Sequence, residues 1–383
     1  MIKEARLIKT FTSIAGIPGL SKQEKLIADE LARRLRGLGI QCKFDRALKN
    51  DGQVGNLIAY LKGNVLAPPL LLNAHMDTVG PIENHGWIRR GNFLESRGKS
   101  ILGADDRSGV AVILEVLEHL AETNAPHPPL EVVFTVAEEI GLMGVKQLDC
   151  SMLRARHGIV LDSGNPLQPV VAAPQAYKLT FKVQGKAAHA GVSPERGINA
   201  LQVAAKAISR IKIGRIDFET TANIGIMHSG TATNIVPESA EVFGEARSHN
   251  LKKLNAQIKH MRHAFRKAVS EAKKPGTAFA GLPRLTEKIE FDYPRMKLTG
   301  KDPMVRLIKK AGKQLGRQVA LRVGGGGSDA NILNARKIQC LILGSGMERV
   351  HSVEERLNLD HLILSARLLA RAIELFPQFA NSK

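Results

Sequence analysis

Short apolar segments that alternate with helical periodicity are the feature that most constrains this fold. Residues 70–74, 131–137, 158–161 and 340–343 are largely apolar, as expected of strands buried on both faces of a sheet. Between the first two segments, residues 108–120 carry apolar side chains at helical spacing. This alternation predicts an α/β domain with a largely parallel central sheet flanked by helices.

A different pattern occupies the middle of the chain. After about residue 174, strands and helices follow in the order β-α-β-β-α-β, which is typical of a ferredoxin-like α+β domain. We therefore expect one domain made of residues 1–175 and 297–383, interrupted by an inserted domain of residues 176–296. The insert is expected to contain strands at 177–183, 222–227, 241–246 and 288–293 and helices at 198–211 and 251–274.

Near the N-terminus, Ser21 and Glu24 precede a stretch with helical apolar spacing, residues 26–35. Ser followed three residues later by Glu is the pattern of a capping box, in which both side chains bond free N–H groups of the first turn. We therefore interpret this pair as a helix cap.

Composition indicates a soluble protein of a reducing compartment. The three cysteines, at positions 42, 150 and 340, are far apart, which excludes a disulfide framework and a cysteine-rich zinc module. The N-terminal residues lack an apolar core of signal-peptide length, and the apolar runs are too short to cross a bilayer. We expect a cytoplasmic protein without a membrane partner.

The net charge is the one unusual bulk property. Lys and Arg number 55 against 36 Asp and Glu, which gives a net charge of +19. Eight of the cations lie in residues 251–274, so a basic nucleic-acid-binding protein is a rival class. Three Tyr and one Trp provide few surfaces for stacking bases, which argues against nucleic acid. We interpret the basic stretch as a solvated helix face.

Acidic residues and histidines follow the predicted strands, where open α/β sheets bind their ligands. His75 and Asp77 come directly after the first strand, and alternate residues of an extended chain point to the same side. Asp105 and Asp106 precede the predicted helix at 108–120. They could cap that helix, or they could supply a carboxylate that bridges two cations.

Two further strands end in acids. Glu138 and Glu139 follow 131–137, and Asp162 follows 158–161, while His351 lies in the loop after the last buried strand. A buried, unpaired carboxylate is costly, so acids at these places require a reason. Metal coordination combined with proton transfer provides one, and mixed imidazole and carboxylate ligands suit a pair of zinc or similar ions.

These clusters belong to longer motifs. HMDTV starts at His75, GADDRSG at Gly103, AEEIG at Ala137 and LDSG at Leu161, and the insert contains GKAAHAG, TATNIVPE and GEARS. In order and spacing the chain resembles the M20 zinc peptidases over nearly its whole length. It is most similar to the peptidase T (tripeptide aminopeptidase) branch and its shorter peptidase-T-like relatives. The resemblance implies a catalytic domain with two divalent metal ions, and an inserted lid and dimerisation domain.

The resemblance also implies roles for the clustered residues. His75 would bind one Zn²⁺ ion, with Asp77 orienting its ring. Asp105 would bridge both ions, and its peptide bond to Asp106 would be cis. Glu138 would be the general base for the metal-bridged water. The remaining metal ligands implied are Glu139, Asp162 and His351. Co²⁺ or Mn²⁺ could replace zinc, and the substrate implied is a short peptide cut at its N-terminal bond.

In the insert, His189 resembles an imidazole that reaches the active site across a homodimer and stabilises the oxyanion. Asn234 and Arg247 resemble substrate contacts, and the planar fork of Arg247 suits a peptide carboxylate. An ordinary surface ion pair is the alternative for Arg247.

Residues 324–329, with the sequence GGGGSD, form the last motif. A phosphate loop is excluded because the Gly-Lys-Ser/Thr ending is missing. The resemblance implies instead a substrate-facing loop in which Gly325 and Gly326 present bare backbone. Ser328 is interpreted as a helix N-cap, since no partner base for a nucleophile is evident.

Arg107 stands where the family motif usually has Lys, and the chain is shorter than a full peptidase T. Other M20 activities therefore remain as alternatives, namely a dipeptidase, a carboxypeptidase or an N-acyl amino acid amidohydrolase. Substrates with free and blocked termini distinguish these activities.

Overall fold

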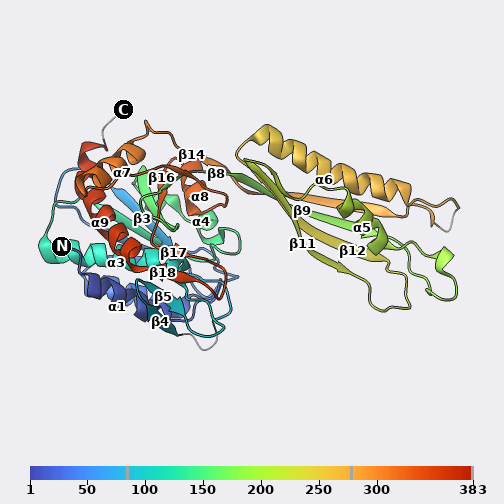
Figure 1. Cartoon of the computed structure of the whole chain (residues 1–383), viewed down its shortest axis with the longest axis horizontal. Coiled ribbons are helices and arrows are strands. Elements are labelled where there is room, and N and C mark those ends of the chain that lie inside the picture. Colours follow the sequence, from blue (N-terminus) through green and yellow to red (C-terminus); the bar gives the residue numbers. More distant parts are fainter. Residues whose placement is uncertain (83–85, 277–278, 381–383) are drawn as a thin grey trace. The chain divides into compact units, whose positions relative to one another are not determined.

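The computed structural model of the protein describes residues 1–82, 86–276 and 279–380. The chain forms two compact units, coloured by sequence in Figure 1. The larger unit consists of Met1–Ala173, Met296–Gly324 and Ser328–Lys383, and the smaller of Pro174–Arg295 with Gly325–Gly327.

A nine-stranded mixed sheet forms the centre of the larger unit. Its middle strands run parallel in the order β6 (Leu130–Thr135), β3 (Leu70–His75), β7 (His157–Leu161) and β16 (Gln339–Leu343). Antiparallel pairs extend the sheet on both sides, and one short strand adds a further parallel pair at one side. The flanking strands are β1 (Gln41–Phe44), β2 (Leu57–Leu61), β8 (Val170–Ala173), β14 (Met296–Lys297) and β15 (Arg322–Val323).

Helices cover this sheet and bury its apolar strands. The long helix α3 (Ala104–Thr123) packs against β3 and β7, and α1 (Glu4–Ala15) and α9 (Leu359–Leu375) pack against α3. Residues on all of these elements share one buried apolar core. The other helices of the unit are α2 (Lys25–Gly37), α4 (Met143–Gln147), α7 (Pro303–Gln314) and α8 (Asp329–Ala335). The predicted α/β fold is therefore confirmed.

A small antiparallel sheet lies beside this core, with the order β17-β18-β5-β4. Its strands are β4 (Trp87–Arg90), β5 (Phe93–Ser96), β17 (Met347–Glu348) and β18 (Arg356–Asn358). The connection between β17 and β18, residues 349–355, carries His351. This sheet was not predicted, because its strands are only two to four residues long.

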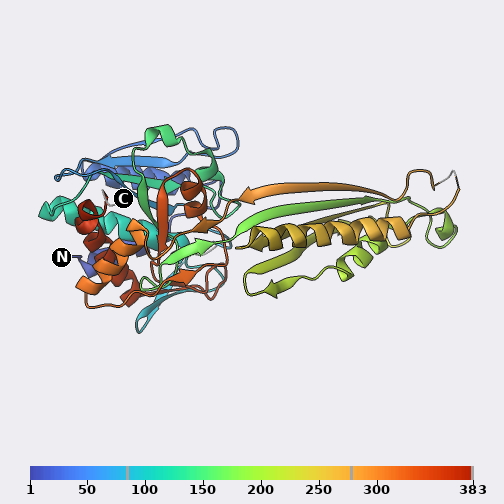
Figure 2. The same cartoon turned by 90° about the horizontal axis from the view of Figure 1, so that it is seen from above.

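The smaller unit is a five-stranded antiparallel sheet with the order β10-β11-β12-β9-β13. Its elements are β9 (Gln175–Gln184), α5 (Ala200–Ser209), β10 (Gly214–Asp217), β11 (Thr220–Ser229), β12 (Ser239–Ser248), α6 (Leu251–Glu271) and β13 (Arg284–Tyr293). Helices α5 and α6 pack on each other and on the sheet (Figure 2). The rings of Phe181 and Phe265 stack between sheet and helix at 4.1 Å. This is the predicted β-α-β-β-α-β order with one additional edge strand, β10.

The predicted capping box is wrong. Glu24 is the N-cap residue of α2, but its side chain makes no capping hydrogen bond. The Ser21 hydroxyl donates instead to Asp77, and the Glu24 carboxylate accepts the N–H groups of Lys22 and Ala137. Both side chains are therefore drawn toward the end of β3 and the turn after β6.

None of the helices in the described part of the chain is both long enough and apolar enough to cross a bilayer.

Candidate functional site

The ends of parallel strands bring the first predicted residues together. His75 is the last residue of β3, which pairs in parallel with both β6 and β7. Glu138 and Glu139 follow β6, and Asp162 follows β7. Parallel strands have their carboxyl ends at one edge of the sheet, so these four residues leave the sheet at a common edge.

Asp105, in the first turn of α3, lies between two imidazole rings. Its Oδ1 atom is 3.1 Å from Nε2 of His75, and its Oδ2 atom is 3.2 Å from Nε2 of His351. Nε2 of His351 is also 2.9 Å from Oε2 of Glu139. Ligand atoms of His75, Asp105 and Glu139 all lie within 4.8 Å of one another. One carboxylate thus presents a separate oxygen to each imidazole, an arrangement that suits a bridge between two cations.

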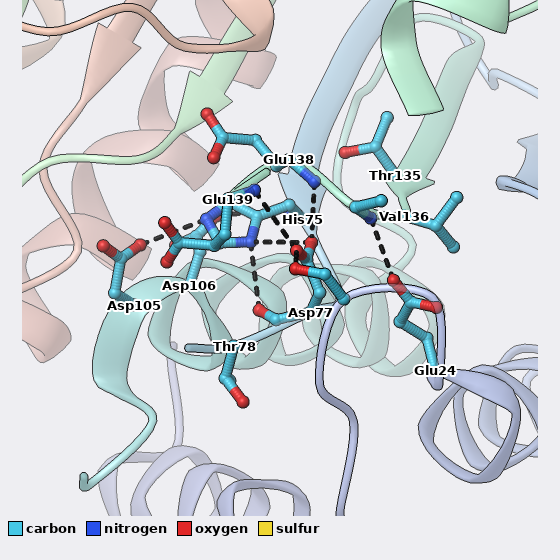
Figure 3. Close-up of polar contacts among 12 residues, drawn as sticks. Glu24, His75, Asp77, Thr78, Asp105, Asp106, Thr135, Val136, Glu138 and Glu139 are labelled. Carbon is cyan, nitrogen blue, oxygen red and sulfur yellow. Dashed lines mark hydrogen bonds and ion pairs between the residues drawn. The ribbon is translucent and has the colours of Figure 1, made fainter. Parts of the chain in front are cut away.

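Asp77 holds the other side of the His75 ring, as Figure 3 shows. Nδ1 of His75 is 3.1 Å from the Asp77 carbonyl oxygen and 3.4 Å from its Oδ1. The buried Asp77 carboxylate also accepts the N–H groups of Glu138, at 3.0 Å, and Glu139, at 3.2 Å. Asp77 therefore fixes the imidazole and the backbone of both glutamates at once.

The peptide bond between Asp105 and Asp106 is cis, as the resemblance implies. The Asp106 side chain is buried and turned toward backbone groups. Its Oδ2 atom accepts the N–H of His75 at 3.3 Å, and its Oδ1 atom accepts the N–H of Gly109 at 3.1 Å. Asp106 thereby links the end of β3 to the start of α3.

Ser21 and two buried charged residues, Glu24 and Arg107, lie around Asp77 and the turn after β6. Ser21 donates its hydroxyl to Asp77 at 2.6 Å, and Glu24 accepts the N–H of Ala137 at 2.9 Å. The fully buried Arg107 donates to the Ile14 carbonyl, and its charge attracts those of Asp77 and Glu24. These supporting roles were missed because the residues that meet here are distant in the sequence. The signal available was an acid, Glu24, close to the apolar face of a predicted helix.

Hydrogen bonding favours the protonated imidazoles. Side-chain hydrogen bonds with Asp105 and Glu139 raise the pKa of His351 to about 10. Burial alone would lower the pKa of His75, but its hydrogen bonds with Asp105 and Asp77 outweigh burial and raise the pKa well above its usual range. Burial opposes ionisation of Asp105, yet its bonds to the two histidines hold its pKa below the usual range.

The remaining acids of the cluster repel one another. Burial, reinforced by neighbouring carboxylates, raises the pKa of Glu138 and of Asp162 well above the usual range. Burial also raises the pKa of Glu139. Divalent cations stabilise buried carboxylates that repel one another, and two imidazoles with several carboxylates would suit zinc.

In the smaller unit, His189 and Asn234 lie on adjacent segments. His189 forms an antiparallel bridge with Ile235, and the N–H of Ala190 donates to the Asn234 carbonyl at 2.9 Å. Both His189 and Asn234 are exposed. Their side chains are therefore available to a ligand.

Arg247, on β12, lies close to the glycine loop in the same unit. A Cβ atom at Gly326 would be 3.9 Å from Nη1 of Arg247, and one at Gly327 would be only 2.5 Å from Cζ of Tyr293. Arg247 also forms an ion pair with Glu245 at 2.7 Å. Arg247 thus forms the ion pair that was the alternative to a substrate contact, and its guanidinium also has the bare backbone of the loop as a neighbour.

Ser328 begins α8 with a complete capping box in which Asn331 is the partner. The interpretation of Ser328 as a helix cap is confirmed.

Glu24 makes the stability of the protein depend on pH. Burial raises its pKa from 4.5 to about 6, so the folded state holds the proton more tightly than the unfolded state. The resulting stabilisation is complete below pH 4.5 and is lost as the pH rises through 6. We expect Glu24→Gln to flatten the loss of stability between these pH values, measured by chemical denaturation.

The matched control is Glu30→Gln on the same helix. Bonds to Arg33, and further bonds to Arg34, lower the pKa of Glu30 to about 2, so this variant should not flatten the curve in that interval. Identical pH profiles for Glu24→Gln and the unmodified protein would contradict the role given to Glu24.

Comparison with known proteins agrees with this geometry. A family model described as peptidase family M20/M25/M40 matches residues 71–375. The uncharacterised protein YqjE of Bacillus subtilis is 38% identical over 376 residues, which are 98% of this chain and 99% of that protein. Peptidase T of Escherichia fergusonii is 27% identical over 285 residues, covering 74% of this chain and 68% of the relative.

Two solved structures are similar along almost the whole chain. The aminopeptidase PepT from Bacillus cereus is 35% identical with a TM-score of 0.85, covering 98% of this chain and 99% of that one. A tripeptidase from Staphylococcus aureus is 36% identical with a TM-score of 0.89, covering 99% and 100%. With a family model that spans most of its length and relatives this similar, the chain belongs to peptidase family M20/M25/M40 and is a metallopeptidase.

Proposed function

We propose that the protein is an aminopeptidase with two zinc ions that removes the N-terminal residue of short peptides, with tripeptides as the preferred length. The position of Asp105 between His75 and His351 is the observation that carries this proposal. The similarity to an aminopeptidase and a tripeptidase supports the substrate class.

The residues proposed to hold the metal ions are His75, Asp105, Glu139, Asp162 and His351. Asp105 would be the ligand shared by both ions, since each of its oxygens faces a different histidine. When bound, the two ions polarise the scissile carbonyl and lower the pKa of water.

Glu138 is the proposed general base. Burial raises the pKa of its carboxyl, which brings its affinity for a proton closer to that needed near neutral pH. It takes the proton of the attacking water and returns it to the leaving amine. Asp77 keeps Glu138 in place through the backbone N–H and holds the His75 ring by Nδ1.

Arg247 and the glycine loop are proposed to bind the substrate carboxylate. The guanidinium offers a planar pair of donors, and Gly325 and Gly326 offer backbone N–H groups without side chains in the way. The proximity of Gly326 to Arg247 supports this role. A carboxylate contact of this kind would favour peptides of short, fixed length.

We further propose a homodimer in which His189 and Asn234 serve the partner's active site. Ser239, just after the Asn234 segment, and Arg247 lie eight residues apart on β12. That separation corresponds to about 25 Å along an antiparallel strand. An extended tripeptide spans only about 10 Å. The two ends of β12 are therefore farther apart than one tripeptide is long, which supports the assignment of His189 and Arg247 to different active sites.

The first test is metal removal and reconstitution. Protein stripped of metal by a chelator should not cleave a tripeptide with a free amino group. Addition of Zn²⁺, Co²⁺ or Mn²⁺ should restore cleavage at the first peptide bond, measured by chromatography of the products. An N-acetylated tripeptide is the matched control and should remain intact.

Other outcomes would replace the proposal. Cleavage of the acetylated compound would indicate an amidohydrolase or a carboxypeptidase with the same metal site. Preference for dipeptides would indicate a dipeptidase. Lack of turnover in the metal-loaded protein would return attention to salt-dependent nucleic-acid binding by the basic helix α6.

Substitution of the general base should separate chemistry from metal binding. Glu138→Gln is expected to keep the full metal content, measured by elemental analysis, and to lower kcat by about 10²- to 10⁴-fold. Glu139→Ala is the contrasting variant and should lose metal. A near-normal rate in Glu138→Gln would refute the assignment of the base.

Mixing two inactive variants tests the homodimer. His189→Ala should lower kcat by about 10²- to 10³-fold, because a donor to the oxyanion is lost. After subunit exchange in an equal mixture of His189→Ala and Glu138→Gln, only the mixed dimer has a site with both groups. Activity should then return to about a quarter of the unmodified level. Activity that stays at the mean of the two variants' activities would place His189 in the site of its own chain, or outside the reaction.

A further inference from the structure

We propose that Glu355 is a positioning residue of the metal centre, which holds the Asp105 and His351 segments at metal-binding separation. This inference rests on the proposed function, because it concerns the ligands assigned there. Glu355 belongs to none of the motifs on which the family resemblance was based, and its side chain does not itself face the cluster as a ligand. It acts through the backbone.

Glu355 is 1% exposed, and its carboxylate forms hydrogen bonds with the backbone of residues 102, 103 and 105. Its Oε2 atom accepts the N–H of Gly103 at 2.7 Å, and its Oε1 atom accepts the N–H of Asp105 at 2.9 Å. The partners are about 250 residues apart in the sequence. The Glu355 side chain therefore binds the backbone of the segment that carries Asp105.

The same residue also anchors the His351 loop. Residues 349–355 fold into a tight turn, in which the N–H of Glu355 donates to the Ser352 carbonyl at 3.0 Å and the Ser352 hydroxyl donates to the Arg349 carbonyl at 2.8 Å. The His351 side chain is 52% exposed, so packing alone fixes it weakly. Glu355 is thus the link from this turn to the segment of Asp105.

Glu355 therefore bonds both the segment of Asp105 and the turn that carries His351. The 3.2 Å separation of Asp105 Oδ2 and His351 Nε2 depends on the distance between residues 103–105 and 349–355, which Glu355 spans. Loss of the carboxylate would let these segments separate, so a metal ion would have to draw them together when it binds. Ordering ligands at the moment of binding lowers affinity.

Capping of α3 is the alternative explanation, since the N-cap residue Gly103 has no side chain to offer. A cap alone would affect the stability of the protein and leave metal affinity unchanged. Glu131 provides a matched control. It is 4% exposed, and its carboxylate likewise accepts backbone N–H groups, from Arg154 at 2.8 Å and from Ala155 at 3.0 Å. It lies on β6 but contacts none of the proposed ligands.

The experiment compares Glu355→Gln with Glu131→Gln. Zn²⁺ affinity is measured by competition with a chromogenic chelator, the ligand geometry by the visible absorption of bound Co²⁺, and stability by the thermal midpoint of the metal-stripped protein. We expect both variants to lower the midpoint. Only Glu355→Gln should weaken Zn²⁺ binding, by about 10- to 100-fold, as is typical when a partner of a ligand is removed.

The results are decisive in either direction. If folded Glu355→Gln has the Zn²⁺ affinity and the Co²⁺ spectrum of the unmodified protein, the inference is overturned. Weakening of Zn²⁺ binding in Glu131→Gln by the same factor as in Glu355→Gln would also overturn it. If Glu355→Gln does not fold, Glu355→Asp, which keeps the charge with a shorter reach, takes its place and should bind Zn²⁺ more weakly than the unmodified protein. An unmodified protein that binds no Zn²⁺ would refute both proposals. One that binds Zn²⁺ but cleaves no peptide would refute only the proposed function.

Discussion

The buried carboxylate of Asp77 is the interaction on which the rest of the centre depends. It accepts the N–H groups of Glu138 and Glu139, receives the Ser21 hydroxyl and faces Nδ1 of His75. An ionised carboxylate without water is tolerated only when its lone pairs are used in this way. The end of β3, the turn after β6 and the loop before α2 are therefore bound to one side chain, and none of them can shift alone.

Much of this centre could be predicted because the ends of buried strands can be recognised in a sequence. Apolar runs such as 70–74 define buried strands, and an acid or histidine that follows one must lie at the edge of the sheet. His75 and Glu139 were expected at a common edge on these grounds, and Asp105 was expected beside them from the family resemblance. The structure brings ligand atoms of all three within 4.8 Å of one another. The cap at Ser328 was also predictable, because its pattern is local.

Contacts between distant parts of the chain could not be predicted. The Ser21 and Glu24 pattern fits a local cap, yet tertiary packing offers Ser21 a carboxylate 56 residues away and Glu24 a backbone N–H 113 residues away. Burial decides between these partners, and it is a property of the assembled sheet and helices. The same holds for Glu355, whose partners are known only once the small sheet has brought β17 and β18 beside the start of α3.

The raised pKa values of His75 and His351 have a consequence for how such a centre is loaded. Protons and metal ions compete for the same lone pairs, so binding of a divalent cation by these residues would release protons. The apparent metal affinity would then rise roughly tenfold per pH unit for each proton displaced. Acidification would therefore release a bound cation by mass action.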